Sequence, residues 1–235
     1  MHNTLVTVLE LRVRRFLKNN SDIFKKHGKY TCKGSPYYAD LPLKESESLL
    51  RILGIMHGDG NMSGSRILIS ENDINFVKKI SLLFKKLFGL TPNIFHDKGR
   101  NSYYCHIKNS VTYRYFTDVL EIPKGAVRPR LTLPSYLKKL KLKLQKEYVG
   151  GLYDAEGWLT TRQAHIGFSI VNKEIRNFIS SILKKCGIKH SISFRDRREN
   201  MEYELHIYGK SNLKKFQEQI SFEHPAKIAK ISKFY

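Results

Sequence analysis

An internal repeat constrains the fold of this chain more than any other feature of its sequence. Residues 50–60, LRILGIMHGDG, resemble residues 147–157, EYVGGLYDAEG. Both segments predict an apolar helix that contains glycine and ends on a small residue, a carboxylate and a glycine. The carboxylates Asp59 and Glu156 stand at the same place in the two copies. Self-similarity of this kind predicts two copies of one structural unit.

The segments that follow the two copies correspond as well. In each, a strand leads into an amphipathic helix that stops at a glycine, a hairpin follows, and a second helix closes the unit. The matching segments are residues 67–72 and 166–172, the glycines Gly89 and Gly187, residues 94–108 and 191–208, and residues 113–120 and 213–220. The sequence therefore predicts an α+β fold of two αββαββα repeats, related by a pseudo-twofold axis, with antiparallel sheets.

Proline-rich residues separate the two predicted repeats. The expected parts are a basic N-terminal extension (residues 1–45), the first repeat (residues 46–121), a linker (residues 122–144) and the second repeat with a C-terminal tail (residues 145–235). The linker contains Pro123, Pro129 and Pro134, which interrupt regular structure. The extension begins with a basic segment that predicts a helix over residues 4–26.

The charge balance indicates a polyanionic partner. The chain has 42 Lys and Arg against 21 Asp and Glu, a net charge of +21, which favours nucleic acid over a membrane surface. No apolar run approaches the roughly 20 residues of a membrane span, so we expect no membrane partner. The three cysteines are far apart and lack zinc-site spacing, which favours a reducing intracellular setting, either the cytoplasm or an organelle matrix.

Glycines within the two repeated helices predict that these helices pack closely on each other. A helical glycine costs up to about 1 kcal/mol relative to alanine, so Gly54, Gly150 and Gly151 indicate backbone contact. Such packing would bring Asp59 and Glu156 together, where they repel each other and oppose both helix dipoles. Oxygen ligands without nearby His or Cys favour Mg²⁺, and two such ions can promote phosphodiester hydrolysis. The alternative is that Asp-Gly and Glu-Gly only terminate helices.

Residues 52–60 and 149–157 resemble the two namesake motifs of the LAGLIDADG homing endonucleases of the single-chain, two-motif type. The order of elements over residues 49–228 is also similar to that family. The resemblance implies that Asp59 and Glu156 are the metal-binding catalytic acids, at sites completed by Gly58 and Ala155. It also implies basic residues near the metals, and the nearest matches are Lys124 and Lys227. The sixth motif position, often acidic in the family, is His57 in one copy and Asp154 in the other.

The family's fold implies that one antiparallel sheet from each repeat sits astride DNA, so that the two sheets form a saddle in the major groove. Strand alternation predicts a set of DNA-contacting residues on the outward faces. These are Arg66, Ser70, Tyr104, His106, Lys108, Arg195, Arg197 and Tyr208, with His96, Lys98 and Arg100 extending the basic rim. The same alternation predicts an inward set: Ile67, Ile69, Ile94, Cys105, Ile107, Ile192, Phe194, Leu205 and Ile207.

The resemblance implies a monomeric, Mg²⁺-dependent endonuclease that makes a staggered double-strand break in an extended asymmetric or pseudo-palindromic DNA site. No Cys or Ser starts the chain and no His-Asn ends it, so we expect a free-standing enzyme rather than a self-splicing insert. The resemblance alone implies that an intron encodes it. Two alternatives of the same fold stay open: a splicing cofactor (maturase) that binds intron RNA, and a DNA-binding regulator whose active site has decayed. A basic scaffold without catalysis would not require paired glycine helices that end in carboxylates.

Overall fold

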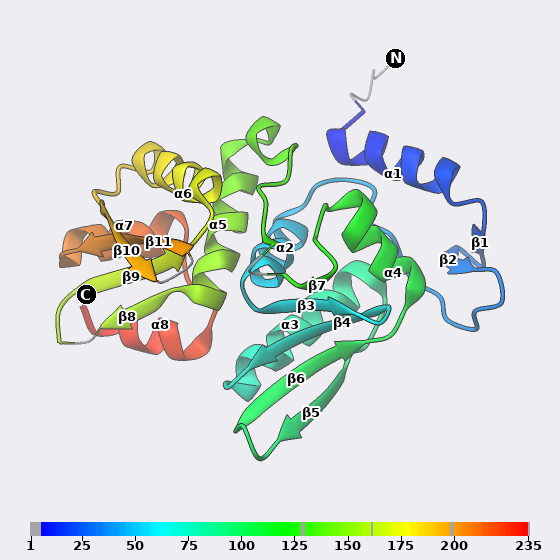
Figure 1. The fold of residues 1–235 in the computed structure, drawn as a ribbon, viewed down its shortest axis with the longest axis horizontal. Helices are drawn as coiled ribbons and strands as arrows, with labels where there is room; N and C mark the ends of the chain where they lie inside the picture. The colour runs from blue at the N-terminus through cyan, green and yellow to red at the C-terminus, as the bar shows by residue number, and fades with distance from the viewer. Residues whose placement is uncertain (1–5, 128–129, 161, 198–199, 235) are drawn as a thin grey trace. The chain divides into compact units, whose positions relative to one another are not determined.

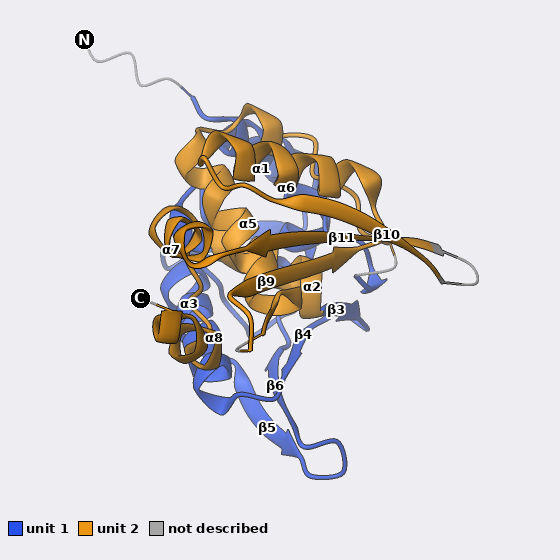
Figure 2. Ribbon diagram, turned by 90° about the vertical axis from the view of Figure 1, so that its left-hand side faces the viewer, with its two compact units in different colours: residues 1–49, 60–127 blue, residues 50–59, 128–235 orange. Residues whose placement is uncertain are grey.

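The structure, a computed structural model, describes residues 6–127, 130–160, 162–197 and 200–234 (Figure 1). The chain forms two compact units, and neither is continuous in sequence. One comprises residues 1–49 and 60–127, and the other residues 50–59 and 128–235 (Figure 2). Most of helix α2 (Glu47–Asp59) therefore belongs to the second unit, although it precedes the strands of the first repeat.

The first unit is built on a five-stranded antiparallel sheet with the order β5-β6-β4-β3-β7. Its strands are β3 (Gly60–Ser63), β4 (Arg66–Glu71), β5 (Asn93–Asp97), β6 (Ser102–Ile107) and β7 (Gly125–Ala126). Helix α3 (Ile74–Phe88) packs against β4 and β6. The Asp73 side chain caps its N-terminus, and Gly89 ends it in the left-handed conformation that favours glycine.

The predicted closing helix of the first repeat consists of two pieces. Helix α4 (Ser110–Arg114) continues as a π-helix, η1 (Tyr115–Val119). Phe116 from this segment stacks on Phe84 of α3 with ring centroids 5.8 Å apart, and both rings are fully buried. This aromatic contact anchors the helices over one face of the sheet.

The N-terminal extension packs onto the first unit. Helix α1 (Val8–Asn19) contacts η1, and Arg12 Nε donates to the Val119 carbonyl at 2.7 Å. The predicted helix over residues 4–26 is too long, because residues 23–26 form β1 (Ile23–Lys26), which pairs with β2 (Lys29–Cys32). The intervening residues His27 and Gly28 both have positive φ, at 50° and 81°, as a tight hairpin turn requires.

The second unit carries a four-stranded antiparallel sheet with the order β10-β11-β9-β8. Its strands are β8 (Trp158–Thr160), β9 (His165–Ile170), β10 (Ser191–Arg197) and β11 (Asn200–Tyr208). Its helices are α5 (Leu142–Glu156), α6 (Lys173–Lys185), α7 (Lys210–Gln219) and α8 (Pro225–Ile231), with short 3-10 turns η3 (Leu137–Lys139) and η4 (Ser232–Phe234). Helices α6 and α7 pack against β11.

The order of elements confirms the predicted α+β class. Each repeat runs helix, two strands, helix, two strands, helix, and both sheets are antiparallel with the same strand order apart from the added β7. Among the described helices, none has both the length and the apolar character needed to cross a bilayer. The three cysteines are unpaired with one another, and burial raises the pKa of the Cys105 thiol to about 12.

Candidate active site and nucleic-acid interface

Glycines let helices α2 and α5 touch through their backbones, as the sequence predicts. A Cβ atom on Gly54 would overlap the carbonyl oxygen of Tyr148, and one on Gly151 would overlap the carbonyl oxygen of Arg51. Farther along the pair, a Cβ on Gly58 would overlap the Ala155 side chain and lie 3.0 Å from Glu156 Cγ. The close packing therefore extends to the C-terminal ends of both helices.

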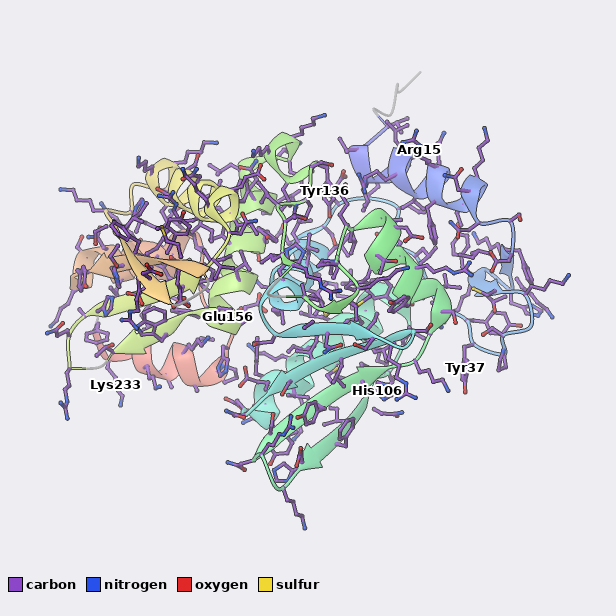
Figure 3. The ribbon with its side chains drawn as sticks, in the orientation of Figure 1. Arg15, Tyr37, His106, Tyr136, Glu156 and Lys233 are labelled. Carbon is purple, nitrogen blue, oxygen red and sulfur yellow. The ribbon has the colours of Figure 1, made fainter. Side chains whose placement is uncertain are left out.

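The two motif carboxylates stand at these helix ends. Asp59 is the last residue of α2 and Glu156 the last residue of α5, and both are partly exposed. Figure 3 labels Glu156. Since Gly58 lies against Ala155 and Glu156, all four predicted metal-site residues belong to one place in the second unit. The described residues include no cluster of three or more His, Cys, Asp or Glu side chains suited to a metal. A donor set of two carboxylates fits Mg²⁺, which takes one or two carboxylates and keeps several waters.

Lys227 contacts the end of α5. Its Nζ donates to the carbonyl oxygens of Tyr153 at 3.0 Å and Ala155 at 3.3 Å, and also to that of Asp154. The structure thus brings this predicted basic residue to the helix end that carries Glu156. Its ammonium group offsets the negative end of the helix dipole, and in this position it caps carbonyls.

Lys124 lies in the first unit. It is exposed and directly precedes β7, which pairs with β3. Strand β3 begins immediately after Asp59 in the chain. The two lysines therefore differ in their surroundings: Lys227 is fixed on helix-end carbonyls, whereas the Lys124 side chain reaches solvent.

Two polar pairs cross the helix interface at equivalent positions of the two motifs. Arg51 of α2 donates to Asp154 of α5, with Nη1 3.1 Å from Oδ2. His57 of α2 shares a hydrogen bond with Tyr148 of α5, with Nδ1 2.8 Å from the hydroxyl oxygen. All four side chains are buried. The sixth motif position therefore serves the same geometric role in both copies, with an ion pair in one and a neutral pair in the other.

Burial determines the protonation of this interface. It lowers the pKa of His57 to about 3, so the imidazole is neutral at ordinary pH. It raises the pKa of the Asp154 carboxyl, while the Arg51 guanidinium and two backbone N–H donors lower it in part. Those donors are Glu223 at 2.8 Å and His224 at 3.0 Å. Because His224 directly precedes α8, Asp154 also fixes the start of the helix that carries Lys227.

The outer face of each sheet is the face opposite its helices. On the first sheet, strand register places Arg66, Ser70, Tyr104 and His106 on this face, as the sequence predicts (Figure 3 labels His106). The Ser70 hydroxyl bonds to that of Ser102 at 2.8 Å. The remaining predicted members lie near its edges: Lys108 follows β6, and Lys98 and Arg100 lie in the turn between β5 and β6.

His96, predicted to extend the basic rim, does not lie on the outer face. Its register partner is Tyr103, which lies on the helix side of the sheet, and the two rings stack with centroids 4.3 Å apart. The neighbouring residue, Phe95, takes the outward position and stacks on Tyr104, with centroids 5.0 Å apart. Since side chains alternate along a strand, outward Phe95 requires inward His96.

On the second sheet, Arg195 and Tyr208 occupy the outer face. Arg195 Nη2 lies 3.4 Å from Glu204 Oε1, and the Tyr208 ring stacks on His165 with centroids 4.4 Å apart. Arg197 belongs to β10 and pairs with Asn200 in the register, but its side chain lies outside the described part of the chain.

Three members of the predicted inward set are exposed. Ile94, Ile192 and Phe194 point to the helix side by register, yet 38%, 39% and 74% of their surface is exposed. They lie on β5 and β10, the edge strands of the two sheets, so side-chain direction alone does not bury them. The other six predicted inward residues are buried.

Several outer-face residues are absent from the predicted set of DNA-contacting residues. Leu68 and Phe95 lie on the first sheet, and Trp158, His165 and Glu204 lie on the second. Trp158 lies across its neighbour Gly167, where a Cβ would overlap the indole. Strand alternation between Ile67 and Ile69 was the signal that could have placed Leu68 outward.

Comparison with known proteins identifies the fold. Residues 143–221 match the family described as LAGLIDADG-like domain. The crystal structure of I-DmoI in complex with DNA and Mn has a TM-score of 0.55 and 22% identity, and the match covers 77% of this chain and 99% of that one. Full-length DUF199/WhiA from Thermatoga maritima has a TM-score of 0.54 and 16% identity, over 86% of this chain and 62% of that one.

Curated relatives share only a segment with this chain. A glutamine–fructose-6-phosphate aminotransferase of Methanocaldococcus jannaschii is 27% identical over 196 residues, which cover 81% of this chain and 18% of the relative. A probable translation initiation factor IF-2 of the same organism is 26% identical over 197 residues, with 80% and 16% covered. The chain spans less than a fifth of either protein, and the two names describe unrelated activities.

Proposed function

Because the chain contains a LAGLIDADG-like domain at residues 143–221 and has the LAGLIDADG fold, we propose that it is a site-specific DNA endonuclease that uses a divalent metal ion. The contact of Gly58 with Ala155 and Glu156 carries the proposal, because it joins the helix ends that bear Asp59 and Glu156. Two carboxylates at joined helix C-termini are costly without a cation. The neighbour I-DmoI has been solved with DNA and Mn, and with DNA and Ca.

In this proposal Asp59 and Glu156 hold Mg²⁺ with Gly58 and Ala155 beside them. The chemistry that two such ions supply is activation of water and stabilisation of the departing 3′ oxygen. Lys227 holds the carbonyl end of α5 in place, and Lys124 is the exposed cation that contacts a phosphate. The product is a staggered double-strand break, made by a monomeric, intron-encoded enzyme.

The outer face of each sheet is the proposed DNA interface. The net charge of +21 supports a polyanionic partner, and Arg66 and Arg195 point outward from strands of the two sheets. Such ribbons of β-structure can enter the major groove and read base edges.

A second candidate is a DNA-binding regulator that does not cut. The likeness to WhiA favours it, since that match covers 86% of this chain. The retained pair of acids favours the endonuclease, because a binding protein has no use for two carboxylates facing phosphate.

Cleavage assays on defined variants distinguish the two candidates. Duplexes that wild type binds are enriched from a randomised pool and cloned into a plasmid, which is incubated with Mg²⁺, Mn²⁺, Ca²⁺ or EDTA. We expect wild type to linearise the plasmid with Mg²⁺ or Mn²⁺ and only to bind with Ca²⁺, whose longer, looser coordination misplaces the reacting groups.

Asp59→Asn and Glu156→Gln should bind the duplex at least as tightly as wild type but leave the plasmid intact. Glu174→Gln, at an exposed acid that pairs with Lys138, is the matched control and should cut normally. Cleavage by both motif variants would refute the two-carboxylate proposal. Specific binding without cleavage by wild type under every ion would establish the regulator.

A further inference from the structure

A hollow of about 440 Å³ opens on the outer face of the first sheet. Its lining combines two apolar side chains with polar and cationic ones: Asn61, Ser63, Arg66, Leu68, Phe95 and His106. The combination indicates a ligand that presents an apolar group and a polar edge side by side.

Strand register fixes the arrangement of this hollow. Leu68 of β4 lies directly beside His106 of β6, and Phe95 of β5 lies directly beside Tyr104 of β6. Phe95 is 47% exposed although its ring stacks on Tyr104. Leu68 and Phe95 therefore line the hollow from strands β4 and β5, with the β6 side chains His106 and Tyr104 between them.

Polar groups stand at the edge of this apolar surface. His106 Nε2 is buried and has no hydrogen-bond partner among the described residues. Arg66, on the same face of β4, is exposed and close enough to contribute to the lowered pKa of His106, after the larger effect of burial. A neutral imidazole can donate or accept one hydrogen bond at this position.

Thymine matches this combination among the groups of the major groove. It displays a 5-methyl group next to the O4 acceptor, and apolar side chains are the usual contacts of that methyl. We propose that Leu68 and Phe95 read the 5-methyl group of thymine, so that the half of the DNA site bound by the first sheet carries an A·T pair there. This inference rests on the proposed DNA interface.

At the matching position of the second sheet, a different side chain supplies the apolar surface. Gly167 of β9 pairs with His206 as Leu68 pairs with His106. The indole of Trp158 lies over this glycine, and the neighbouring outer-face groups include the Arg195–Glu204 ion pair. The two sheets therefore present different surfaces, so thymine reading through this device belongs to one half of an asymmetric site.

Removing a single methyl group from DNA tests the inference. The duplex enriched by wild type is resynthesised with deoxyuridine in place of thymidine, one position at a time, and Kd is measured in Ca²⁺ to separate binding from cleavage. Burial of one methyl corresponds to about a fourfold change in Kd. We expect Kd to rise about fourfold when deoxyuridine replaces one or two particular thymidines within one half of the site.

Variants of the lining residues test whether the weaker binding of the deoxyuridine duplex arises at this hollow. With Leu68→Ser or Phe95→Ser, thymidine and deoxyuridine duplexes should bind equally at those positions. Ile94→Ser is the matched control, because Ile94 is exposed to a similar degree on the same strand but faces the opposite side, and it should keep the fourfold difference. Using two separate variants, each checked by its Tm, keeps the test valid if one of them fails to fold.

The outcomes distinguish a failure of thymine reading from a failure of the proposed DNA-binding function. An enriched duplex that tolerates deoxyuridine at every position overturns thymine reading and leaves the endonuclease proposal standing. Retention of the full difference by both serine variants overturns thymine reading in the same way. If no duplex is enriched by wild type, sequence-specific DNA binding fails and thymine reading fails with it.

Discussion

His57 and Asp154 occupy the same motif position, yet they stabilise the helix interface by different chemistry. Asp154 forms a buried ion pair with Arg51, whereas His57 shares a neutral hydrogen bond with Tyr148. Arg51 also pairs with Glu147 at 2.9 Å, so the dependent partner is the buried Asp154 carboxylate. Removing the cation from such a buried pair typically costs about 3–5 kcal/mol. A neutral pair requires no such balance, but it requires the imidazole to stay unprotonated.

The pH dependence of stability tests the protonation of His57. Its pKa of about 3, against the ordinary 6.5, means that the unfolded chain takes up a proton below pH 6.5 that the folded chain does not. The His57 contribution to the free energy of unfolding is complete above pH 6.5 and falls by about 1.4 kcal/mol per pH unit toward pH 3.

Urea unfolding of wild type and His57→Gln between pH 7 and 4.5 measures this contribution, because glutamine can bond to Tyr148 but does not titrate. We expect the stability of wild type to decline more steeply below pH 6.5 than that of the variant. The raised pKa of Asp154 is common to both proteins and cancels in the comparison. Parallel curves would show that His57 titrates normally.

At the scale of elements, the sequence predicted best those boundaries that are set by local chemistry. Helix α3 ends at Gly89, whose φ of 63° suits glycine, and the sequence identified that stop. The N-terminal helix was predicted too long because the hairpin turn after β1 puts a histidine at positive φ, a position where Asn or Gly is the recognisable signal. The change from α4 to the π-helix η1 has no sequence signature that we can identify.

Site residues on strands depend on register, which is a tertiary property. A shift of one residue turns every side chain to the other face. His96 was assigned to the outer rim although Ile94, two residues earlier, was correctly predicted to face inward. Arg66, Tyr104 and His106 were placed correctly because the buried neighbours Ile67, Cys105 and Ile107 fix the alternation. Leu68 and Phe95 could not be singled out by a search for basic residues.

The α2–α5 contact predicts a steep cost for any side chain at its centre. Gly54→Ala should lower the free energy of unfolding by about 1–3 kcal/mol or more, because the new methyl meets the backbone of Tyr148 and overpacking forces the helices apart. Gly99→Ala is the matched control, since a Cβ there would lie an ordinary 3.4 Å from Asp97 Oδ1. Equal stability of the two variants in urea would contradict the backbone contact.

At the scale of the whole molecule, a segment of the first repeat belongs to the compact unit of the second. Residues 50–59 follow the N-terminal extension in sequence but pack in the second unit with α5. The glycines Gly54 and Gly151 predicted this packing of the two helices, but an order of elements that repeats twice predicts that each helix stays with its own repeat. The predicted domain boundaries describe where each repeat begins and ends along the chain. The compact units are divided differently, at residues 49/50, 59/60 and 127/128.

The high positive charge of the chain predicts that DNA affinity depends strongly on salt concentration. Contacts to phosphate position the DNA and determine this salt dependence, whereas contacts to bases determine sequence preference. With about 6–10 phosphate contacts, log Kd should rise with log salt concentration by roughly 0.9 per contact.

Arg195→Ala, on the outer face of the second sheet, should relax preference at one or a few base pairs, by about 1–3 kcal/mol if Arg195 pairs with guanine. Lys78→Ala, an exposed control on α3, should leave preference unchanged. Binding of both variants to enriched and random duplexes across salt concentrations measures this, and altered preference in the Lys78 variant alone would remove the sheet from the interface.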